Sequence, residues 1–257
     1  MIHPSSFVHP EAQIDPSVEI GPFCTVGPHV KIGARTRLIS HIVLEGWTEI
    51  GEENEIFPFC VLGAIPQDLK YRGEATHLII GNKNTIRESV TMNLGTVQGG
   101  GVTRVGNDCL IMAYTHLGHD CIVGNHCIIA NYGGLAGHVV VEDHAILGGM
   151  VGVSQFVRIG AYAYVGGSSS LERDIPPFCL AIGTRPTAIK GANIVGLRRR
   201  GFSAESVQKI NEAVKLWVRP DIQKEPCLVE IQERFSDAPE VMGLVEFIRK
   251  SEVGVAR

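Results

Sequence analysis

The sequence has few charged and few aromatic residues. Of its 257 residues, 19% are charged and 6% are aromatic, and the formal net charge is −4. A nucleic-acid-binding protein would carry a broad basic face, so this composition argues against that class. No apolar run approaches the roughly 20 residues that cross a bilayer, and the N-terminus lacks the charged and apolar segments of a signal peptide. We expect a soluble, cytoplasmic protein with no stable membrane insertion.

Paired cysteine motifs are also missing. The chain has seven cysteines, an odd number, and no C-x-x-C motif. This usage is typical of reduced, mostly buried thiols and argues against a disulfide framework or a zinc site. The sequence predicts neither a metal nor a cofactor.

What the sequence does have is an aliphatic residue at every sixth position. A period of six fits neither a helix nor an alternating strand, so the hexad itself must be the structural unit. Three hexads would form one triangular coil of a parallel β-helix, with coils stacked about 4.8 Å apart. The series runs from Ile2 to Leu62, returns at Ile80, Ile86 and Met92, and continues from Val105 to Leu171.

Eighteen residues per coil predict that positions i and i+18 lie one above the other. Cys109 and Cys127 form such a pair, as do His126 and His144. No third ligand is available at the height of the two histidines, so we interpret them as a structural or surface stack and not as a metal site.

The hexads end near Pro176, and the pattern beyond Asn193 becomes helical. Ser203 can cap a helix with an apolar face at Val207, Ile210, Val214 and Trp217, and Glu205 and Lys209 can pair on its outer face. Pro220 and Pro226 interrupt the pattern, and two further helices are expected around Leu228, Ile231 and Phe235 and around Leu244, Phe247 and Ile248. The predicted domains are a β-helix over 1–190 and a helical domain over 191–257.

Two interruptions of the hexads predict loops, at about 63–79 and 93–104. Loops inserted into a solenoid commonly carry function. The first loop contains Gln67, Asp68 and Lys70, a mixture of side chains suited to a polar ligand. The alternative interpretation is a solvent-exposed loop that binds no ligand.

Histidines follow these loops, at His116, His119 and His138. His119 comes two residues after the inward Leu117 and should lie at a turn, with Gly137 one coil above it. An imidazole that titrates near neutrality suits general-base acyl transfer, and a glycine N–H could face an oxyanion. The alternative is that these histidines lie at the surface with their hydrogen bonds made, and take no part in catalysis.

Several motifs along the chain form a recognisable set. They are Gln67-Asp68-Leu69-Lys70, Ile86-Arg87-Glu88, residues 95–101, His116-Leu117-Gly118-His119-Asp120-Cys121, Leu135-Ala136-Gly137-His138, Gln155-Phe156, Asn193 and residues 196–202. Together they resemble the bacterial UDP-N-acetylglucosamine O-acyltransferases, which catalyse the first step of lipid A synthesis. The resemblance covers the whole chain and implies a left-handed parallel β-helix of hexapeptide repeats with a small C-terminal helical domain.

This resemblance implies transfer of an (R)-3-hydroxyacyl group from acyl carrier protein to the 3-hydroxyl of UDP-N-acetylglucosamine by a homotrimer with sites between neighbouring chains. His119 matches the general base, Gly137 the oxyanion donor and Asp120 the acid that orients the base. The matching substrate positions are Gln67, Asp68, Lys70, His116 and His138 near the reaction centre, and Gln155, Asn193, Arg199 and Arg200 for the nucleotide. Residues 198–200 could instead be a solvated helix face or a basic patch that steers the acidic carrier.

The chain departs from the family pattern at Asn93, Leu94, Ser154 and Val195. These departures leave open whether the acceptor is the ordinary sugar or its 3-amino analogue. Gly167 matches a position where a small residue leaves the acyl groove long, which predicts a longer hydroxyacyl chain.

Three other classes remain as alternatives. A γ-type carbonic anhydrase has the same kind of β-helix and binds zinc through three histidines across a subunit interface, for which His116, His119 and His138 are the candidates. A purely structural solenoid would leave both loops without a role. Hexapeptide acyltransferases with other donors or acceptors differ from this assignment only in their substrates.

Overall fold

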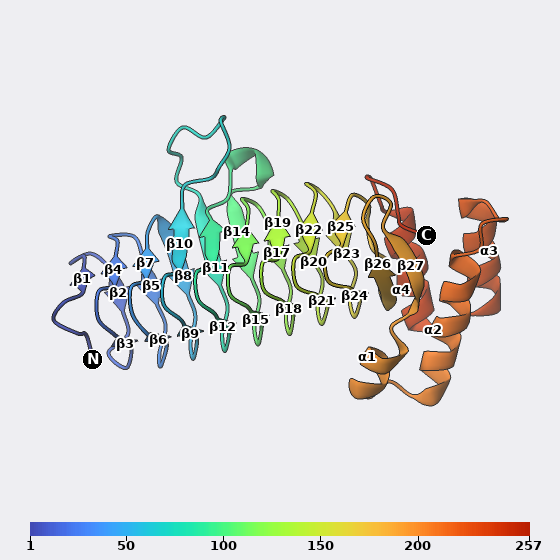
Figure 1. Ribbon diagram of the computed structural model, residues 1–257, viewed down its shortest axis with the longest axis horizontal. Coiled ribbons are helices and arrows are strands. Elements are labelled where there is room, and N and C mark those ends of the chain that lie inside the picture. The colour runs from blue at the N-terminus through green and yellow to red at the C-terminus, as the bar shows by residue number, and fades with distance from the viewer.

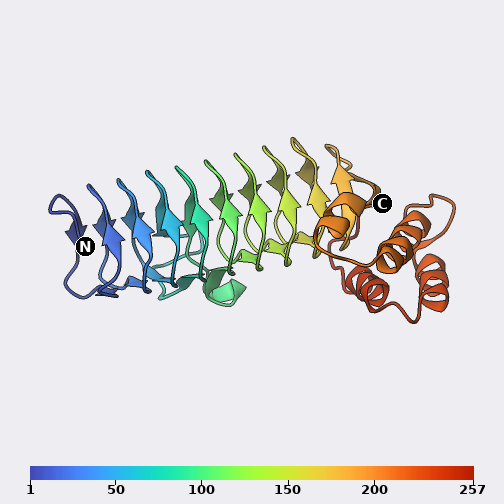
Figure 2. The same ribbon diagram turned by 90° about the horizontal axis from the view of Figure 1, so that it is seen from below.

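The computed structural model describes residues 1–257 as a three-sided solenoid of short parallel strands that ends in a group of helices (Figure 1). Each coil adds one strand to each of three sheets, here named sheets I, II and III. Viewed from below, the helices gather at the C-terminal end of the solenoid (Figure 2).

The three sheets run the length of the solenoid. Sheet I consists of β1 (Phe7–Val8), β4 (Thr25–Val26), β7 (Val43–Leu44), β10 (Val61–Ala64), β13 (Thr91–Asn93), β16 (His116–Leu117), β19 (Gly134–Leu135), β22 (Gly152–Val153) and β25 (Ser170–Leu171). Sheet II consists of β2 (Gln13–Ile14), β5 (Lys31–Ile32), β8 (Trp47–Ile50), β11 (His77–Ile80), β14 (Val102–Val105), β17 (Ile122–Val123), β20 (Val140–Val141) and β23 (Arg158–Ile159). Sheet III consists of β3 (Glu19–Ile20), β6 (Arg37–Leu38), β9 (Glu55–Ile56), β12 (Thr85–Ile86), β15 (Leu110–Ile111), β18 (Ile128–Ile129), β21 (Ile146–Leu147), β24 (Tyr164–Val165), β26 (Cys179–Ile182) and β27 (Ala188–Ala192), of which β27 alone is antiparallel to its neighbour.

The aliphatic ladder forms the core of the solenoid. From Ile20 to Leu171 each of its members is at most 4% exposed, which confirms the predicted inward orientation. Burying one such side chain contributes about 1.5–3 kcal/mol, so the column dominates stability. Ile2 differs from the prediction because it is 49% exposed, and Val8 and Ile14 are only half-buried. The first coil has no coil beneath it to cover these residues.

Both predicted interruptions leave the solenoid on the same side (Figure 1). Residues 65–76 connect β10 to β11, and residues 94–101, with the 3-10 helix η1 (Val97–Gly99), connect β13 to β14. The stacked residues are therefore farther apart in sequence here: Leu62 lies beside Met92, and Met92 beside Leu117. Both loops lie at the corner between sheets I and II, here called the I/II corner.

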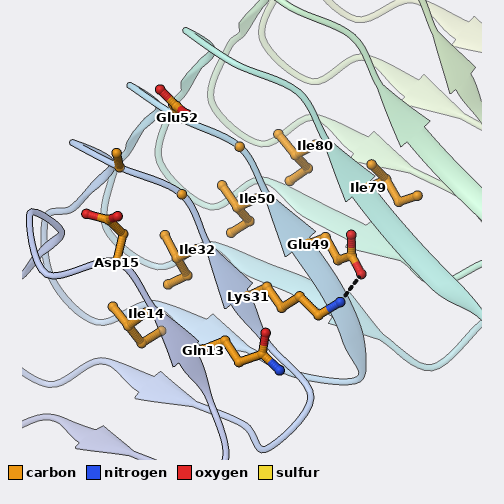
Figure 3. A pocket seen from close by; sticks show the side chains of 13 residues that line it. Gln13, Ile14, Asp15, Lys31, Ile32, Glu49, Ile50, Glu52, Ile79 and Ile80 are labelled. Atoms are coloured by element: carbon orange, nitrogen blue, oxygen red, sulfur yellow. Dashed lines mark hydrogen bonds and ion pairs between the residues drawn. The ribbon is translucent and has the colours of Figure 1, made fainter.

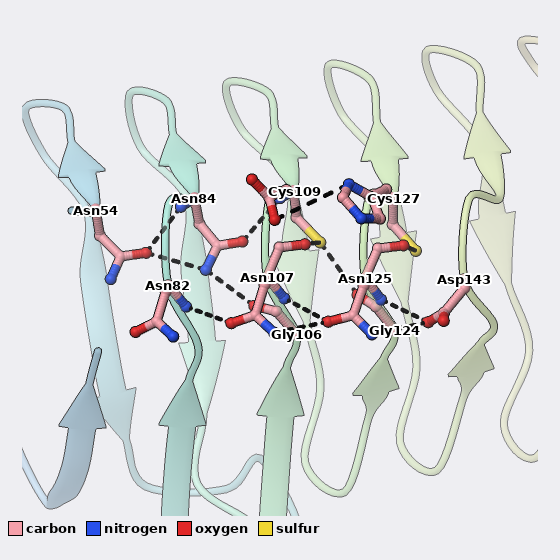
Figure 4. A network of polar contacts seen from close by, with 12 residues as sticks. Asn54, Asn82, Asn84, Gly106, Asn107, Cys109, Gly124, Asn125, Cys127 and Asp143 are labelled. Carbon is pink, nitrogen blue, oxygen red and sulfur yellow. Dashed lines mark hydrogen bonds and ion pairs between the residues drawn. The ribbon is translucent and has the colours of Figure 1, made fainter. Parts of the chain in front are cut away.

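Turns outside the loops stack as the 18-residue rule predicts. The amide of Asn107 donates to the side-chain oxygen of Asn125, 18 residues later, over 2.8 Å (Figure 4). Asn84 donates to Asn54 over 2.9 Å, but these two are 30 residues apart because the first loop lies between them. The rings of His126 and His144 lie parallel with centroids 4.6 Å apart, which confirms the predicted stack. All seven cysteines are free and buried, also as predicted.

The helical tail contains α1 (Ile194–Arg199), α2 (Ala204–Trp217), α3 (Lys224–Arg234) and α4 (Pro239–Arg249). Ser203 caps α2 by accepting from the N–H of Ser206, and Lys209 pairs with Glu205 at 2.9 Å, both as predicted. Pro226 does not interrupt a helix, because it lies in the first turn of α3, where its missing N–H costs no helical hydrogen bond. None of the helices has the length and apolar character needed to cross a membrane.

Candidate active site

His119 and Asp120 occupy the turn that follows β16 at the I/II corner. Nδ1 of His119 lies 2.7 Å from Oδ2 of Asp120. Adjacent residues on a strand point to opposite sides, but Asp120 adopts φ +61°, and this turn geometry brings the two side chains together. Both residues are buried, His119 to 8% exposure and Asp120 to 4%. The expected contact between base and acid is present.

The Asp120 carboxylate is held by the loop between β13 and β14. Its Oδ1 accepts from the N–H of Thr96 over 2.7 Å, and its Oδ2 accepts from the Thr96 hydroxyl over 2.6 Å. The N–H of Asp120 donates to the hydroxyl of Thr103 over 2.8 Å. When Nδ1 of His119 carries the proton, it donates to this carboxylate, and the lone pair of Nε2 is then free for chemistry.

Gly137 lies directly above the His119 ring, as the stacking rule predicted. A Cβ at position 137 would lie 2.5 Å from Cε1 and 2.6 Å from Nε2 of His119. The N–H of Gly137 donates to no backbone oxygen. This N–H, on the residue next to the imidazole, is a donor of the kind that stabilises an oxyanion.

His138 and His116 flank this pair. The His138 ring meets that of His119 edge to face at 5.1 Å and stacks on Phe156 at 4.5 Å. Burial lowers the pKa of His138, a shift that the nearby Asp120 charge opposes. Burial also lowers the pKa of His116, whose Nδ1 lies 2.8 Å from the Thr91 hydroxyl. Both imidazoles are therefore neutral near pH 7.

A groove of about 500 Å³ opens over this corner and across sheet I. Among the predicted site residues, those that line it are Gln67, His116, His119, Gly137 and Gln155. Asn93 and Ser154, two of the departures from the family pattern, line it as well. Gly134 and Gly152 form part of its floor, and a Cβ at either would meet no atom within 4 Å. The groove thus extends along sheet I from the histidines.

Asp68 and Lys70 belong to the first loop but do not line the groove. Asp68 accepts from the N–H of Lys70 over 2.9 Å, and the Lys70 side chain is exposed. Burial lowers the pKa of His138, and the charges of Asp120 and, more weakly, Asp68 oppose this shift.

Of the four residues matched to the nucleotide, Gln155 lines the groove and the other three lie on another face. Asn193, Arg199 and Arg200 line a separate pocket of about 490 Å³ on sheet III, together with Tyr164 and Leu180. Asn193 accepts from the N–H of Gly196 and so caps α1, and it donates to the carbonyl of Tyr162. Within one chain the structure does not bring these residues to His119.

Gly167 lies in the turn between β24 and β25, at the corner between sheets III and I. It is exposed and is not among the residues that line the groove. A side chain there would approach the carbonyl oxygen of Gly149 at 3.1 Å.

A second hollow, near the N-terminal end of sheet II, has different chemistry. It is lined by Ile14, Ile32 and Ile50 and crossed by the Lys31–Glu49 ion pair at 2.7 Å (Figure 3). No histidine lines it. The I/II corner is therefore the better candidate for acid–base chemistry.

The same corner holds a possible metal cluster, formed by His119, Asp120 and His138, whose ligand atoms lie within 4.8 Å of one another. His116 is not part of it, so the three histidines of the carbonic anhydrase alternative do not converge in one chain. Oδ2 of Asp120 already accepts from Thr96 and contacts His119. This competition disfavours a metal.

Sequence reasoning gave no role to Thr96, Thr103 or Gly99. A Cβ at Gly99 would lie 2.0 Å from Cγ of Asp120, so the glycine makes room for the carboxylate. The extra residues of the second loop break the 18-residue stacking, and no positional rule could place Thr96 beside Asp120. The sequence feature that came nearest to indicating this contact was the glycine-rich run of the second loop.

Comparisons with known proteins show the family of the chain. A family model described as UDP N-acetylglucosamine O-acyltransferase, domain 2, matches residues 174–256, and one described as bacterial transferase hexapeptide (six repeats) matches residues 103–137. An enzyme of Thermodesulfovibrio yellowstonii named acyl-[acyl-carrier-protein]--UDP-N-acetylglucosamine O-acyltransferase is 47% identical over 222 residues, 86% of each chain. Its namesake from Anaeromyxobacter is 46% identical over 214 residues, 83% of each chain.

Solved structures extend the similarity to the whole chain. The UDP-N-acetylglucosamine acyltransferase of Francisella novicida superimposes with a TM-score of 0.97 at 38% identity, covering 100% of this chain and 94% of that one. The predicted left-handed β-helix with its helical tail is thereby confirmed. The chain belongs to the UDP-N-acetylglucosamine O-acyltransferase family and is an acyltransferase.

Proposed function

We propose that the chain transfers an (R)-3-hydroxyacyl group from acyl carrier protein to the 3-hydroxyl of UDP-N-acetylglucosamine, with His119 as general base. The relatives named for this reaction support the substrates. The observation that carries the base is the imidazole of His119, which contacts Asp120 through Nδ1 and lies against Gly137 at Nε2.

The chemistry follows from these positions. Nε2 of His119 takes the proton of the sugar hydroxyl as its oxygen attacks the thioester carbonyl, and Asp120 stabilises the imidazolium that forms. The Gly137 N–H donates to the oxyanion of the tetrahedral intermediate. Collapse of the tetrahedral intermediate breaks the carbon–sulfur bond, and the thiolate of the carrier protein takes the proton from His119. Ester and free thiol leave with no net change in protonation.

The acceptor could instead carry a 3-amino group. Asn93 and Ser154 line the groove near His119, so the two departures lie where the acceptor would bind. An amine needs the same removal of a proton after attack, which His119 can perform. The choice between hydroxyl and amine therefore depends on the groove and not on the base.

The proposed enzyme is a homotrimer with sites shared between chains. The groove lies on sheet I, whereas Arg199 and Arg200 lie by sheet III. A guanidinium suits diphosphate oxygens, and packing one chain's sheet III side against another chain's sheet I would complete a site.

Acyl-chain length is proposed to follow from Gly167 and the glycines of the groove floor. The path from His119 across Gly134 and Gly152 leads toward the corner that carries Gly167. Gly134 and Gly152 leave the groove open along sheet I, and Gly167 adds no side chain at the corner beyond its lining, so a longer hydroxyacyl chain is expected.

The test is transfer from a series of (R)-3-hydroxyacyl carrier proteins to UDP-N-acetylglucosamine and its 3-amino analogue. His119→Ala should reduce kcat by about 10⁴-fold or more, the scale seen when the base of a catalytic triad is removed. His126→Ala removes a histidine from a turn outside the groove and should retain wild-type activity. Transfer that survives in His119→Ala would contradict the assigned base.

The dependence of activity on a bound metal distinguishes the proposed acyltransferase from the carbonic anhydrase alternative. That class requires bound zinc for activity, whereas the proposed transfer should persist unchanged after dialysis against a chelator. Loss of transfer on chelation and its return with zinc would favour the metalloenzyme.

A further inference from the structure

We infer that Thr96 is a positioning residue that holds the Asp120 carboxylate in the orientation that fixes His119. This inference rests on the proposed general-base role of His119 and adds a third residue behind the pair. Thr96 touches neither the groove nor His119, and it acts through Asp120.

Thr96 contacts both oxygens of the carboxylate. Its N–H donates to Oδ1 over 2.7 Å and its hydroxyl donates to Oδ2 over 2.6 Å. Oδ2 is also the atom that lies 2.7 Å from Nδ1 of His119. The two Thr96 donors fix the plane of the carboxylate, so Oδ2 cannot rotate away from the imidazole. Hydrogen bonds to charged groups are about twice as strong as neutral ones.

The surrounding loop is built for this contact. Thr96 is 2% exposed, and its oxygen accepts from the N–H of Gly99 as the N-cap of η1. Accepting that N–H leaves the single hydroxyl proton for Asp120. Gly99 itself has no side chain where a Cβ would strike the carboxylate. The loop thus delivers two donors to one buried acid and leaves room for it.

Removing the hydroxyl should affect catalysis more than binding. With one donor fewer, the ionised carboxylate attracts the imidazolium proton more strongly. The neutral imidazole then becomes scarcer at a given pH, which moves the acid limb of the pH–rate profile to higher pH. KM for the sugar nucleotide should not change, because Thr96 does not line the groove.

The experiment compares Thr96→Val, which keeps the shape and loses the hydroxyl, with Thr96→Ser, which keeps the hydroxyl. For Thr96→Val we expect kcat to fall by about 10- to 100-fold, the range for a lost hydrogen bond to a charged group, with an upward shift of the acid limb and an unchanged KM. Thr96→Ser should restore kcat and the pH profile. The matched control is Thr36→Val, another buried threonine whose hydroxyl bonds a backbone oxygen, far from the groove.

A purely structural role predicts a different result. Thr96→Val would then lower the thermal midpoint as Thr36→Val does and leave the acid limb in place, and that outcome would overturn the inference. If Thr96→Val fails to fold, Thr96→Ala replaces it. In either variant ¹⁵N spectra of labelled histidine should show a changed ratio of the two His119 tautomers, and an unchanged ratio also counts against the role.

The outcomes separate this inference from the proposed function. A fully active His119→Ala would remove the general base and with it the reason for a positioning residue. An inactive His119→Ala beside a Thr96→Val variant with wild-type kcat and pH profile would leave the base intact and reject Thr96 alone.

Discussion

At the residue scale, Gly137 is required by its neighbour and not by its backbone. Its φ lies outside the left-handed region that favours glycine, so an alanine would fit the turn. The obstacle is the His119 ring, 2.5 Å from where the Cβ would be. The absence of one side chain therefore positions the base and leaves the N–H open.

Gly137→Ala should fold normally and lose activity. Displacing the His119 ring by a fraction of an ångström to 1 Å should lower kcat by about 10²-fold, the cost of a comparable misplacement in other enzymes. Steady-state kinetics and the thermal midpoint measure the two effects. Gly243→Ala is the control, since a Cβ there meets nothing in α4 and should stabilise the helix by about 0.5–1 kcal/mol. Wild-type kcat in Gly137→Ala would refute the steric argument.

His116 should make stability fall in mild acid. Burial lowers the pKa of its imidazole below the ordinary value of 6.5. Below that value the unfolded chain binds a proton that the folded chain resists, so stability decreases as pH falls through 6.5. The thermal midpoint should drop between pH 7.5 and 5.5, and less steeply in His116→Asn. An identical slope in the variant would assign the effect to other groups, such as His138 and His144, whose pKa values are also lowered by burial.

At the scale of the element, the first loop can be removed without breaking the repeat. Deleting residues 65–76 would place Ile80 six positions after Leu62, which is the regular hexad spacing. The solenoid needs no loop, because β10 and β11 belong to adjacent sheets and hexads elsewhere connect them directly. The deletion also removes Gln67 from the groove.

The deletion variant should therefore unfold cooperatively, like wild type, but should lose at least about 100-fold in kcat/KM because substrate-positioning groups are gone. Circular dichroism measures whether the variant unfolds cooperatively, and steady-state kinetics measure its kcat/KM. The control is a variant in which a Gly/Ser loop of the same length replaces residues 65–76. It distinguishes the effect of losing the side chains of the loop from the effect of shortening the backbone. Full activity in both variants would show that the loop plays no part in the reaction.

The elements differed in how far the sequence could predict them. The ladder was predictable because each coil repeats the same local rule, and Gly137 above His119 followed from that rule alone. The position of Thr96 beside Asp120 was not predictable, because it depends on a loop whose length breaks the 18-residue stacking register. α1 was missed as a separate helix because its six residues are too few to show a helical period. Pro226 was misread because a proline in a first turn resembles a break.

At the scale of the whole molecule, the residues of the proposed site lie on two sides of one chain. His119 lies at the I/II corner beside the groove over sheet I, and Asn193, Arg199 and Arg200 lie by sheet III. These sides face different directions, so in the proposed homotrimer a second chain would bring the two groups of residues to one ligand. Closed threefold symmetry would repeat the same contact three times and leave neither group unpaired.

Mixing two inactive variants tests this arrangement. His119→Ala and Arg199→Ala should each be inactive alone, because every interface then lacks either the base or the guanidinium. In trimers assembled at random from equal amounts, about a quarter of the interfaces pair an intact His119 with an intact Arg199 from the next chain, so about a quarter of wild-type activity should return. Co-expression with two affinity tags provides the mixed trimers. If mixed trimers form but regain no activity, the two residues act within one chain, and the shared site is wrong.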